Sequence, residues 1–432
     1  MALLKDILWT IGGPEAPVGT LVARTKVLPV TDHPGFTQRI TRVPDPVIAG
    51  ARMKARSYPV KKDVAGPFPL SPRVGGGWGM PLKSLFGTES APAQIGAVIK
   101  VRYTGASASC KLIADTAANT LVSKVGVLGA EANDAGFGVA GSIDLTAVPT
   151  DTVTEIVALI EGYADYECRL VTGDGAVISA DIVTLTTQAK GKWTYLFFTR
   201  ATGGAYLRTF TSDLTSTEHG VYSVEGEGYT DNLSYTAVQF TNMKLSAAKA
   251  AMVTATMDAI GFVEAPGAGA SGLTIANLDP GLPLIFGDGT TCLAAHDYPE
   301  ISSLDLAIDD GHNKETFGQG SLGRIYQQKG ELVITGTLQL QLNASSYLLR
   351  ANLGLNTLVG LTFTFKGGLI GGLMYEMIIA EIPYCQIMDP YDFVNDGGAF
   401  AAKVNVEAYN PQGTKWDVPI KFHMISADAA AF

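Results

Sequence analysis

Apolar and polar residues alternate along the second half of the chain, which is typical of β-strands with one buried and one solvated face. Between residues 251 and 258, for example, Ala251, Val253 and Ala255 take one parity, while Thr254, Thr256 and Asp258 take the other. This pattern predicts a mainly β fold. The predicted strands lie at 205–210, 221–225, 235–245, 252–260, 300–308, 331–342, 358–365, 375–383, 399–409 and 418–426.

Residues 92–200 combine strand-like segments with a helical pattern, which predicts a small α+β domain inserted into the β chain. Thr152 and Glu155 are spaced as a capping box, and apolar residues from Val153 to Tyr163 recur at helical spacing. Two more short helices are predicted, at 79–87 and 345–353. The strands predicted within the insertion are 95–103, 110–113, 121–127, 178–185 and 193–198.

Prolines are dense between residues 11 and 75, which excludes long helices there and predicts an extended arm with one strand, 51–58. The resulting organisation divides the chain into five parts. They are a basic arm (1–50), a first β domain (51–91 and 201–265), the insertion (92–200), a linker (266–283) and a second β domain (284–432).

A faint internal repeat supports two β domains. The order strand, short helix, two strands occurs as 51–58, 79–87 and 205–225, and again as 331–342, 345–353 and 358–383. Residues 242–246 followed by 251–258 also resemble 302–306 followed by 331–338. These similarities predict a tandem duplication.

The charge is low and unevenly distributed. Of 432 residues, 17% are charged, and the net charge is −10, which argues against a protein that binds nucleic acid over its whole surface. The first 62 residues carry ten Lys or Arg and four acids, a local charge of +6, so the remainder carries −16. A basic arm on an acidic body can bind nucleic acid or the acidic body of a neighbouring subunit, and the absence of a dense Lys/Arg cluster favours the neighbouring subunit.

Four cysteines, Cys110, Cys168, Cys292 and Cys385, are too widely spaced for a metal clip and are interpreted as free thiols of a reducing compartment. The N-terminal residues lack the features of a secretory signal, and no run of 18 apolar residues is present. These features predict a soluble protein made in a cytoplasm, without contact to a membrane.

Several residues that could carry chemistry have a simpler interpretation. Residues 267–272 fit GxGxxG but follow a proline and favour a linker. His296 and Asp297 lack a nucleophile elbow. Asp389, Asp392 and Asp396 could bind calcium, but their surroundings favour an ordinary turn. The sequence therefore predicts no enzyme activity, cofactor or metal site.

The polar segment 309–330 lies between two predicted strands and is long for a loop in a compact domain. Apolar residues stand among charges of both signs, which favours contact with another protein chain, with a mobile hairpin tip as the alternative. The residues predicted to make this contact are Asp309, Asp310, His312, Lys314, Phe317, Arg324 and Tyr326, together with Arg52, Lys54 and Arg56 of the basic segment.

Over roughly 50–90 and 205–425, the chain resembles the tail tube proteins of long-tailed bacteriophages. The resemblance rests on the order of Gly77-Trp-Gly with Leu82–Gly87, Tyr206–Thr211, Phe240–Gly261, Ile301–Ile308 with its long loop, and Met377–Cys385. The insertion departs from the minimal pattern of that family and looks like a module on the outer side of the tube.

The resemblance implies β-sandwich or barrel folds with a flanking helix, whose sheets join between subunits into a barrel around a lumen. Rings would stack into a tube of the virion tail, assembled in the host cytoplasm, through which DNA passes without specific binding. Two tube folds per chain imply a trimeric, pseudo-sixfold ring, and one fold implies a hexamer. Terminator, tape measure and distal tail proteins are the implied partners, and segment 309–330 and the basic arm would lie between rings.

One alternative is a carbohydrate-binding β-sandwich or adhesin of a virion, with Tyr391, Phe393 and Trp416 as stacking platforms. A hydrolase that uses Asp389 and Asp392 is the least supported alternative.

Overall fold

The computed structural model is mainly β, as the alternation of apolar and polar residues predicts. The residues that it describes are 7–44, 57–147, 150–212, 220–228, 232–267, 271–278, 281–299, 301–312, 330–342, 346, 349–350, 357–371, 373–396, 399–410 and 418–429.

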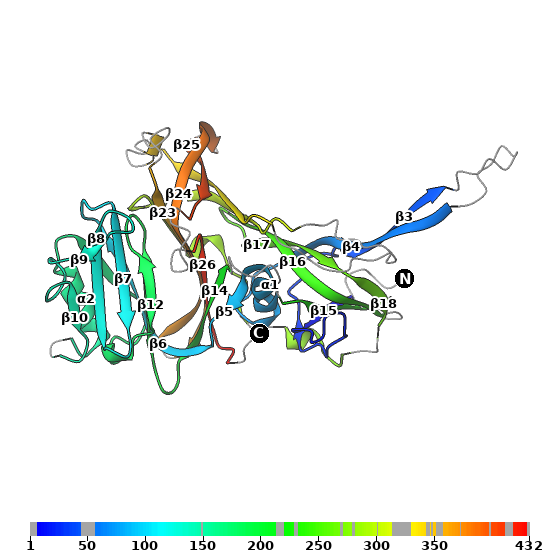
Figure 1. Ribbon diagram of the computed structural model, residues 1–432, viewed down its shortest axis with the longest axis horizontal. Helices are drawn as coiled ribbons and strands as arrows, with labels where there is room; N and C mark the ends of the chain where they lie inside the picture. Colours follow the sequence, from blue (N-terminus) through cyan, green and yellow to red (C-terminus); the bar gives the residue numbers. More distant parts are fainter. Residues whose placement is uncertain are drawn as a thin grey trace, which may run out of the picture.

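Two sets of elements follow one another along the chain, interrupted once by the insertion (Figure 1). The first set consists of β1 (Leu8–Gly12), β2 (Lys26–Val27), β3 (Thr37–Pro44), β4 (Ser57–Leu70), α1 (Gly76–Phe86), β15 (Tyr222–Glu227), β16 (Asn232–Ala248), β17 (Thr254–Gly261) and β18 (Val263–Pro266). The second consists of β19 (Gly289–Leu293), β20 (His296–Asp297), β21 (Ile301–Asp309), β22 (Val333–Gln341), β23 (Val359–Gly371), β24 (Met374–Asp396), β25 (Ala399–Ala408) and β26 (Lys421–Ser426).

The strand pairings of the first set recur in the second, all of them antiparallel. The pairs β1–β2, β1–β15, β3–β4, β4–β17, β15–β16, β16–β17 and β16–β18 match β19–β20, β19–β23, β21–β22, β22–β25, β23–β24, β24–β25 and β24–β26. The predicted duplication is therefore confirmed as a repeat of topology. We call the two sets the first and the second repeat.

The elements that correspond differ from those suggested by sequence. Segment 242–246 lies in β16, whose counterpart is β24, whereas segment 302–306 lies in β21. β16 and β21 are not equivalents but neighbours, which pair antiparallel from Asn242↔Asp309 to Ala248↔Ser303. The similar residues reflect a shared environment, because both strands place one face on the core and one in solvent.

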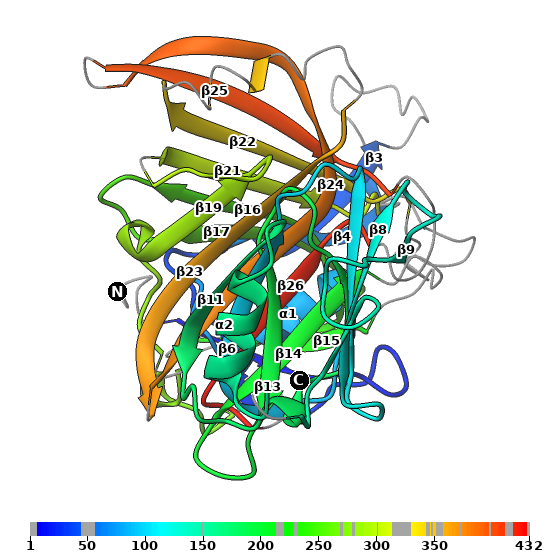
Figure 2. The same cartoon turned by 90° about the vertical axis from the view of Figure 1, so that its left-hand side faces the viewer.

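The pairing of β16 with β21 joins the two repeats into one sheet, ordered β3-β4-β17-β16-β21-β22-β25-β24 (Figure 2). One face of this sheet packs on the main hydrophobic core, with Met243, Leu245, Leu306 and Leu338 buried. Helix α1 covers the same core through Trp78, Leu82, Leu85 and Phe86. We call the eight strands the long sheet.

The elements between the two parts of the first repeat run from β5 to β14, and residues 97–198 among them form a core of their own. These elements are β5 (Gly87–Glu89), β6 (Ala93–Tyr103), β7 (Ser109–Asp115), β8 (Thr120–Gly126), β9 (Ala132–Asn133), β10 (Ser142–Asp144), α2 (Val153–Glu161), β11 (Tyr166–Gly173), β12 (Leu185–Gln188), β13 (Thr194–Thr199) and β14 (Ala205–Ser212). The predicted capping box of Thr152 and Glu155 is present at the start of α2.

Between β5 and β14, three elements differ from the expectations. Residues 178–184 form no strand but contain a 3-10 turn, Ser179–Asp181, because the Ser179 hydroxyl donates to backbone carbonyl groups of Leu145 and Thr150. Only Leu185 belongs to a strand, as the first residue of β12. β11 was not expected, because charged residues interrupt its alternation. β14, expected in the first β domain, pairs with β5, β6 and β26.

The first part of the N-terminal segment, residues 8–27, is not an extended arm. β1 and β2 pack on the first repeat with Trp9, Ile11 and Val27 buried. The strand predicted at 51–58 falls mostly outside the described residues, and β4 follows it. Pro67 and Pro69 are tolerated in β4 because their carbonyl groups accept from Gly35 N and Thr31 N, so their missing N–H groups face that segment rather than β17.

Three further predictions concern short segments. The linker 266–283 contains a 3-10 turn, Ile275–Asn277. A second 3-10 turn, Phe286–Asp288, precedes β19. The helix predicted at 345–353 lies mainly outside the described residues, although Ser346 and Leu349 are helical. The residues from Asp389 to Asp396 form the end of β24 rather than a turn.

Gly66 and Gly336 occupy equivalent positions in the two repeats, where they pair with Ala259 and Val406. A Cβ on Gly66 would lie 2.1 Å from the Gly35 carbonyl oxygen, whereas one on Gly336 would meet the Val406 side chain at 2.8 Å. We expect Gly66→Ala to cost about 3 kcal/mol of unfolding free energy and Gly336→Ala about 1 kcal/mol, because backbone yields less than a side chain. Urea denaturation of both variants measures this, and equal losses would contradict it.

Candidate assembly surfaces

The junction between β16 and β21 is an internal example of how two four-stranded sheets can join. Its solvated face is bridged by the Ser246 hydroxyl, which donates to Asp305 Oδ1 at 2.5 Å. Lys244 stands opposite Ala307 in the same register. The junction is therefore sealed by backbone pairing and by polar side chains on one face.

The solvated face of the long sheet is polar along its length, since every second residue of its central strands points away from the core. Acids outnumber lysines on this face. The residues are Lys244 and Ser246 of β16, Thr254, Thr256 and Asp258 of β17, Asp305 and Asp309 of β21, Thr335, Thr337 and Gln339 of β22, and Lys403, Asn405 and Glu407 of β25.

The long sheet ends in two edges of opposite charge. On one side, β3 pairs with β4 alone among the described strands and carries Arg39 and Arg42. On the other, the last residues of β24 pair with β25 and include the exposed Asp392 and the half-buried Asp396. One donor of the β3 edge, Gln38 N, is capped by Glu264 Oε2 at 3.1 Å.

Unpaired sheet edges are templates for further strands. Opposite charge on the two edges favours their pairing with each other over the pairing of like edges.

The residues predicted to contact another chain are only partly within the described ranges. Asp309 is exposed at the end of β21, but Asp310 and His312 are buried: His312 Nδ1 lies 2.8 Å from Asp310 Oδ1, and its Nε2 lies 2.9 Å from Gln239 Oε1. These two side chains hold the base of the polar loop. Lys314, Phe317, Arg324, Tyr326, Arg52, Lys54 and Arg56 lie outside the described residues.

Other basic residues of the N-terminal segment contact acids of their own chain. Arg24 lies 3.1 Å from Glu225, and Lys26 lies 2.7 Å from Asp428. Part of the local positive charge is thus neutralised within the chain. Arg39 and Arg42 on β3 are the described basic residues at the sheet edge.

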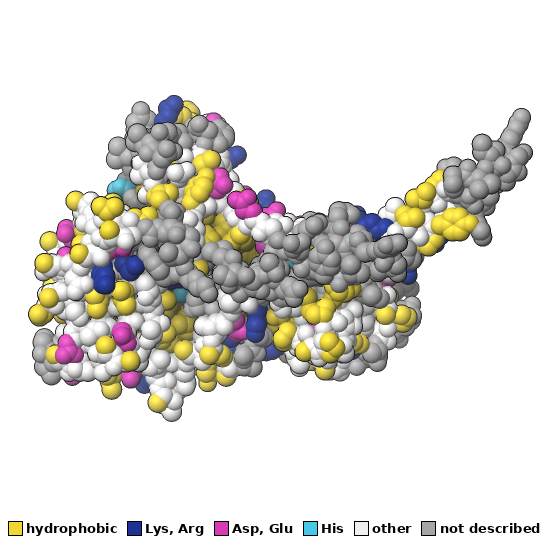
Figure 3. All heavy atoms as spheres, in the orientation of Figure 1, with side chains coloured by type: hydrophobic (Ala, Val, Ile, Leu, Met, Phe, Trp, Pro, Cys, Tyr) yellow, Lys and Arg dark blue, Asp and Glu magenta, His cyan; other side chains and the backbone are white. Residues whose placement is uncertain are grey.

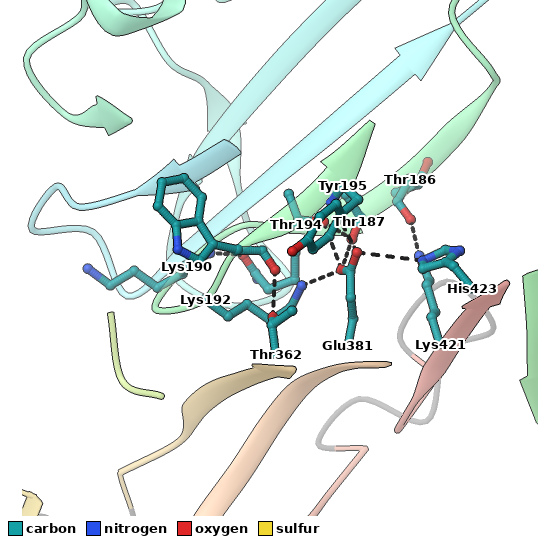
Figure 4. Close-up of polar contacts among 12 residues, drawn as sticks. Thr186, Thr187, Lys190, Lys192, Thr194, Tyr195, Thr362, Glu381, Lys421 and His423 are labelled. Atoms are coloured by element: carbon teal, nitrogen blue, oxygen red, sulfur yellow. Dashed lines mark hydrogen bonds and ion pairs between the residues drawn. The ribbon is translucent and has the colours of Figure 1, made fainter. Parts of the chain in front are cut away.

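A buried polar cluster, which the sequence did not predict, fixes the insertion to the second repeat (Figure 4). Glu381 of β24 lies 2.5 Å from Lys192 Nζ in the turn before β13, and both side chains are buried. The same carboxylate accepts hydrogen bonds from Thr194 Oγ1 (2.8 Å) and Tyr195 N (3.0 Å), and lies 3.5 Å from His423 Nε2 of β26.

Burial alone would raise the pKa of Glu381, but Lys192 and His423 outweigh it and hold the pKa of this carboxyl well below its usual range. Burial lowers the pKa of His423 in spite of the nearby carboxylate. The cluster therefore contains one charged pair and a neutral imidazole. Glu381 itself could have indicated the cluster from the sequence, because it is a charged residue inside an otherwise apolar strand.

Comparison with known families decides what kind of protein carries these surfaces. A family model described as phage tail tube protein matches residues 10–408. The match covers nearly all of the first repeat, the insertion, and the second repeat up to the end of β25. The chain belongs to the phage tail tube protein family. No curated protein matches the chain significantly.

This tail tube protein is accordingly a structural component of a bacteriophage tail. The acids considered for catalysis serve other purposes or lie outside the described side chains. Asp297 accepts from Trp193 Nε1 at 2.6 Å, which ties β20 to the insertion. Asp392 stands opposite Lys403 in the sheet.

Of the three aromatic residues considered for glycan stacking, Phe393 has the Arg350 guanidinium 5.7 Å above its ring. The side chains of Tyr391 and Trp416 are not among those described. Within the described ranges, no group of three or more His, Cys, Asp or Glu side chains could hold a metal ion. None of the described helices is both long and apolar enough to span a membrane.

Removing the charge of Glu381 should destabilise the tail tube protein, because Lys192 would stay buried without its counter-charge. We expect Glu381→Gln to cost about 3 kcal/mol of unfolding free energy. Asp174→Asn, at the exposed pair with Arg200, should cost less than about 1 kcal/mol. Urea denaturation at neutral pH compares the two, and a loss at Glu381 no larger than at Asp174 would contradict a buried ion pair.

The stability of the protein should also fall at acid pH. The pKa values of Glu381 and His423 are both lower in the folded than in the unfolded chain, so the unfolded chain binds more protons as the pH decreases. We expect the unfolding free energy to decrease from about pH 7 towards pH 4. The difference between wild type and Glu381→Gln should shrink below about pH 4, and a constant difference down to pH 3 would contradict this assignment.

Proposed function

We propose that three copies of this tail tube protein close into a ring with pseudo-sixfold symmetry. Rings of this kind would stack into a tube, and DNA would pass through its lumen into the host. The observation that carries the proposal is the repeat of topology within one chain, because two joined four-stranded sheets per chain supply six from three chains. The role is structural and needs no catalytic centre.

The internal junction gives the register of the proposed junction between chains. Ala307 corresponds to Thr37, since they pair with Thr335 and Ala65, the residues before the equivalent Gly336 and Gly66. Lys244 pairs with Thr256, and Thr256 pairs in turn with Pro69 on the next strand. In the same way, Asp392 pairs with Lys403, and Lys403 pairs with Gln339.

Pro69 and Gln339 each lie three residues after these equivalent glycines, so Asp392 corresponds to Lys244. The internal pair Lys244↔Ala307 therefore predicts the pair Asp392↔Thr37 between neighbouring chains.

The charges of the two edges support this arrangement. In this register Arg39 of β3 would lie two residues from Thr37 and diagonally opposite Asp392 of the neighbouring chain, so the basic segment and the acidic body attract each other as the sequence predicts. Arg42 and Asp396 lie in opposite directions from this pair and would not meet. Glu264 would have to release Gln38 N when the neighbouring strand arrives. This exchange protects the isolated chain from nonspecific edge pairing.

The solvated face of the long sheet would line the lumen, because the opposite face is covered by the core and α1. Acids outnumber lysines on this face, which suits a conduit for DNA. DNA phosphates bind to Lys and Arg because this contact releases counterions, so a face with few such residues would not retain the DNA. The insertion would lie on the outer side.

Segment 309–330 and the basic residues Arg52, Lys54 and Arg56 would lie at contacts between rings. Terminator, tape measure and distal tail proteins would meet the tube at its ends or in its lumen. Assembly would take place in the host cytoplasm.

A disulfide between chains tests the proposed register. Residues directly opposite in an antiparallel pair have Cα atoms about 4.5–5.5 Å apart, which permits a disulfide. We expect Thr37→Cys with Asp392→Cys to give, on non-reducing gels of oxidised assemblies, a ladder that ends at three chains. The four native cysteines are buried and should not contribute.

The matched control is Lys244→Cys with Ala307→Cys, which should form a disulfide within one chain. A ladder that continues to six chains would contradict the trimeric ring. A disulfide in the control without any link between chains in the test variant would contradict the pairing of β3 with β24.

A further inference from the structure

The start of β25 exposes a large apolar side chain. Phe400 is 73% exposed, although it has the same parity as Ala402, which is buried in the main core. Its equivalent in the first repeat is Val253, since each lies three residues before the equivalent Lys403 and Thr256, and Val253 is 0% exposed. Hydrophobic atoms, drawn in yellow, are visible over β24 and β25 in Figure 3. The position that is closed in the first repeat is therefore open in the second.

In the first repeat, this position is closed by the linker segment that precedes β19. Leu284 is buried in the main core, and its carbonyl oxygen accepts a hydrogen bond from Val253 N at 2.9 Å. The next residue, Ile285, forms an isolated antiparallel bridge with Met252. Residues 284–286 thus lie along the turn between β16 and β17 and cover Val253.

The linker segment has an equivalent in the first repeat, which is the N-terminal segment before β1. Ile11 of β1 pairs with Val224, directly after a register shift between β15 and β16. Leu293 of β19 pairs with Leu361, directly after the corresponding shift between β23 and β24. Ile11 and Leu293 are therefore equivalent, and so are the segments that precede them.

The N-terminal segment has the apolar residues that this position requires. Counted back from Ile11 and Leu293, the residues that correspond to Leu284, Ile285 and Phe286 are Ala2, Leu3 and Leu4, which lie outside the described residues. The sizes of the opposed side chains are exchanged between the two positions. Leu284 opposes the small Val253, whereas Ala2 would oppose the large Phe400, so the total volume is nearly kept.

We propose that residues 2–4 of one chain cover Phe400 of the neighbouring chain whose β24 pairs with its β3. The inference rests on the proposed ring, because the pairing of β24 with β3 repeats the pairing of β16 with β21. It brings the segment before β1 to the place that the linker has at the internal junction. Leu3 then stands opposite Ala399, and Phe400 N donates to the Ala2 carbonyl oxygen, in the geometry of the linker.

The same segment is too short to cover Phe400 of its own chain. The linker lies on the β16 side of β21, so the equivalent place is on the free side of β3. Five strands of the long sheet separate β3 from β25, which corresponds to about 29 Å. Residues 1–6 extend over at most about 21 Å. The exposed position therefore takes its cover from a second copy of the chain.

A disulfide between chains tests this contact in assemblies of the full-length protein. The hydrogen bonds of the linker flank the pair Met252↔Ile285, so its Cα atoms should lie about 4.5 Å apart, which permits a disulfide. We expect Leu3→Cys with Ala399→Cys to give, on non-reducing gels after oxidation, a ladder that ends at three chains. The matched control, Met252→Cys with Ile285→Cys, should form a disulfide within one chain.

Each other result of this experiment overturns the inference in a different way. Either substitution alone should give no ladder, since the native cysteines are buried. A disulfide within one chain from Leu3→Cys with Ala399→Cys would assign the segment to its own chain, and a ladder beyond three chains would assign it to another ring. A ladder from Thr37→Cys with Asp392→Cys, but none from the Leu3 pair, would overturn the inference alone. No ladder from either pair, with no rings, would overturn the proposed function and the inference with it.

An exchange of side-chain sizes tests the same contact without a cross-link. Phe400→Val should raise about tenfold the protein concentration at which half of the chains are in rings, because apolar contact between chains is lost. Adding Ala2→Leu recreates the pair of Val253 with Leu284 and should restore most of the loss. Val139→Ala, at a residue of the insertion that is 85% exposed, should leave ring formation unchanged.

Analytical ultracentrifugation over a range of concentrations measures these effects. Ring formation by Phe400→Val at the wild-type concentration would overturn the inference, and so would a double variant that assembles no better than Phe400→Val alone.

Discussion

The backbone groups at the edge of a β-sheet must find partners, and the pairing of β16 with β21 satisfies this requirement between the two repeats. Without it, each repeat would expose two edges of a four-stranded sheet. With it, the chain keeps one edge at β3 and one at the end of β24. Every assembly property proposed for this tail tube protein follows from the same pairing made again, between chains.

The duplication also explains why the two edges differ. In a ring of chains that each contain one fold, the same two sheet edges must form every junction between neighbours. Here one junction is internal and is bridged by Ser246 and Asp305, while the junction proposed between chains would have Arg39 on one side and Asp392 on the other. Charge can thus select the junction between chains without disturbing the junction within the chain.

The insertion is held rigidly because its contact with the second repeat is dry and charged. Glu381 and Lys192 compensate each other only in one geometry, and Thr194 and Tyr195 N saturate the carboxylate. Trp193 adds a second anchor, with Lys100 and Arg102 over its ring and Asp297 at its nitrogen. A module fixed in this way has one orientation relative to the sheet, so all copies would present the same outer surface.

Local patterns predicted much of this fold, and long-range contacts explain the rest. Alternation located most strands after residue 205, and the capping box located α2, because both signals depend on near neighbours. Most of β4 was missed because Pro67 and Pro69 are tolerated through the distant segment 31–35, which local patterns do not reveal. Glu381 stood out in the sequence, but its partners Lys192 and His423 are brought to it only by the fold.

The most direct test of the account is electron cryomicroscopy of the assemblies formed by the full-length protein. We expect a hollow tube whose rings each contain three chains, with six similar sheets around the lumen and β3 of one chain beside β24 of the next. Rings of six chains, or a filament without a lumen, would contradict it.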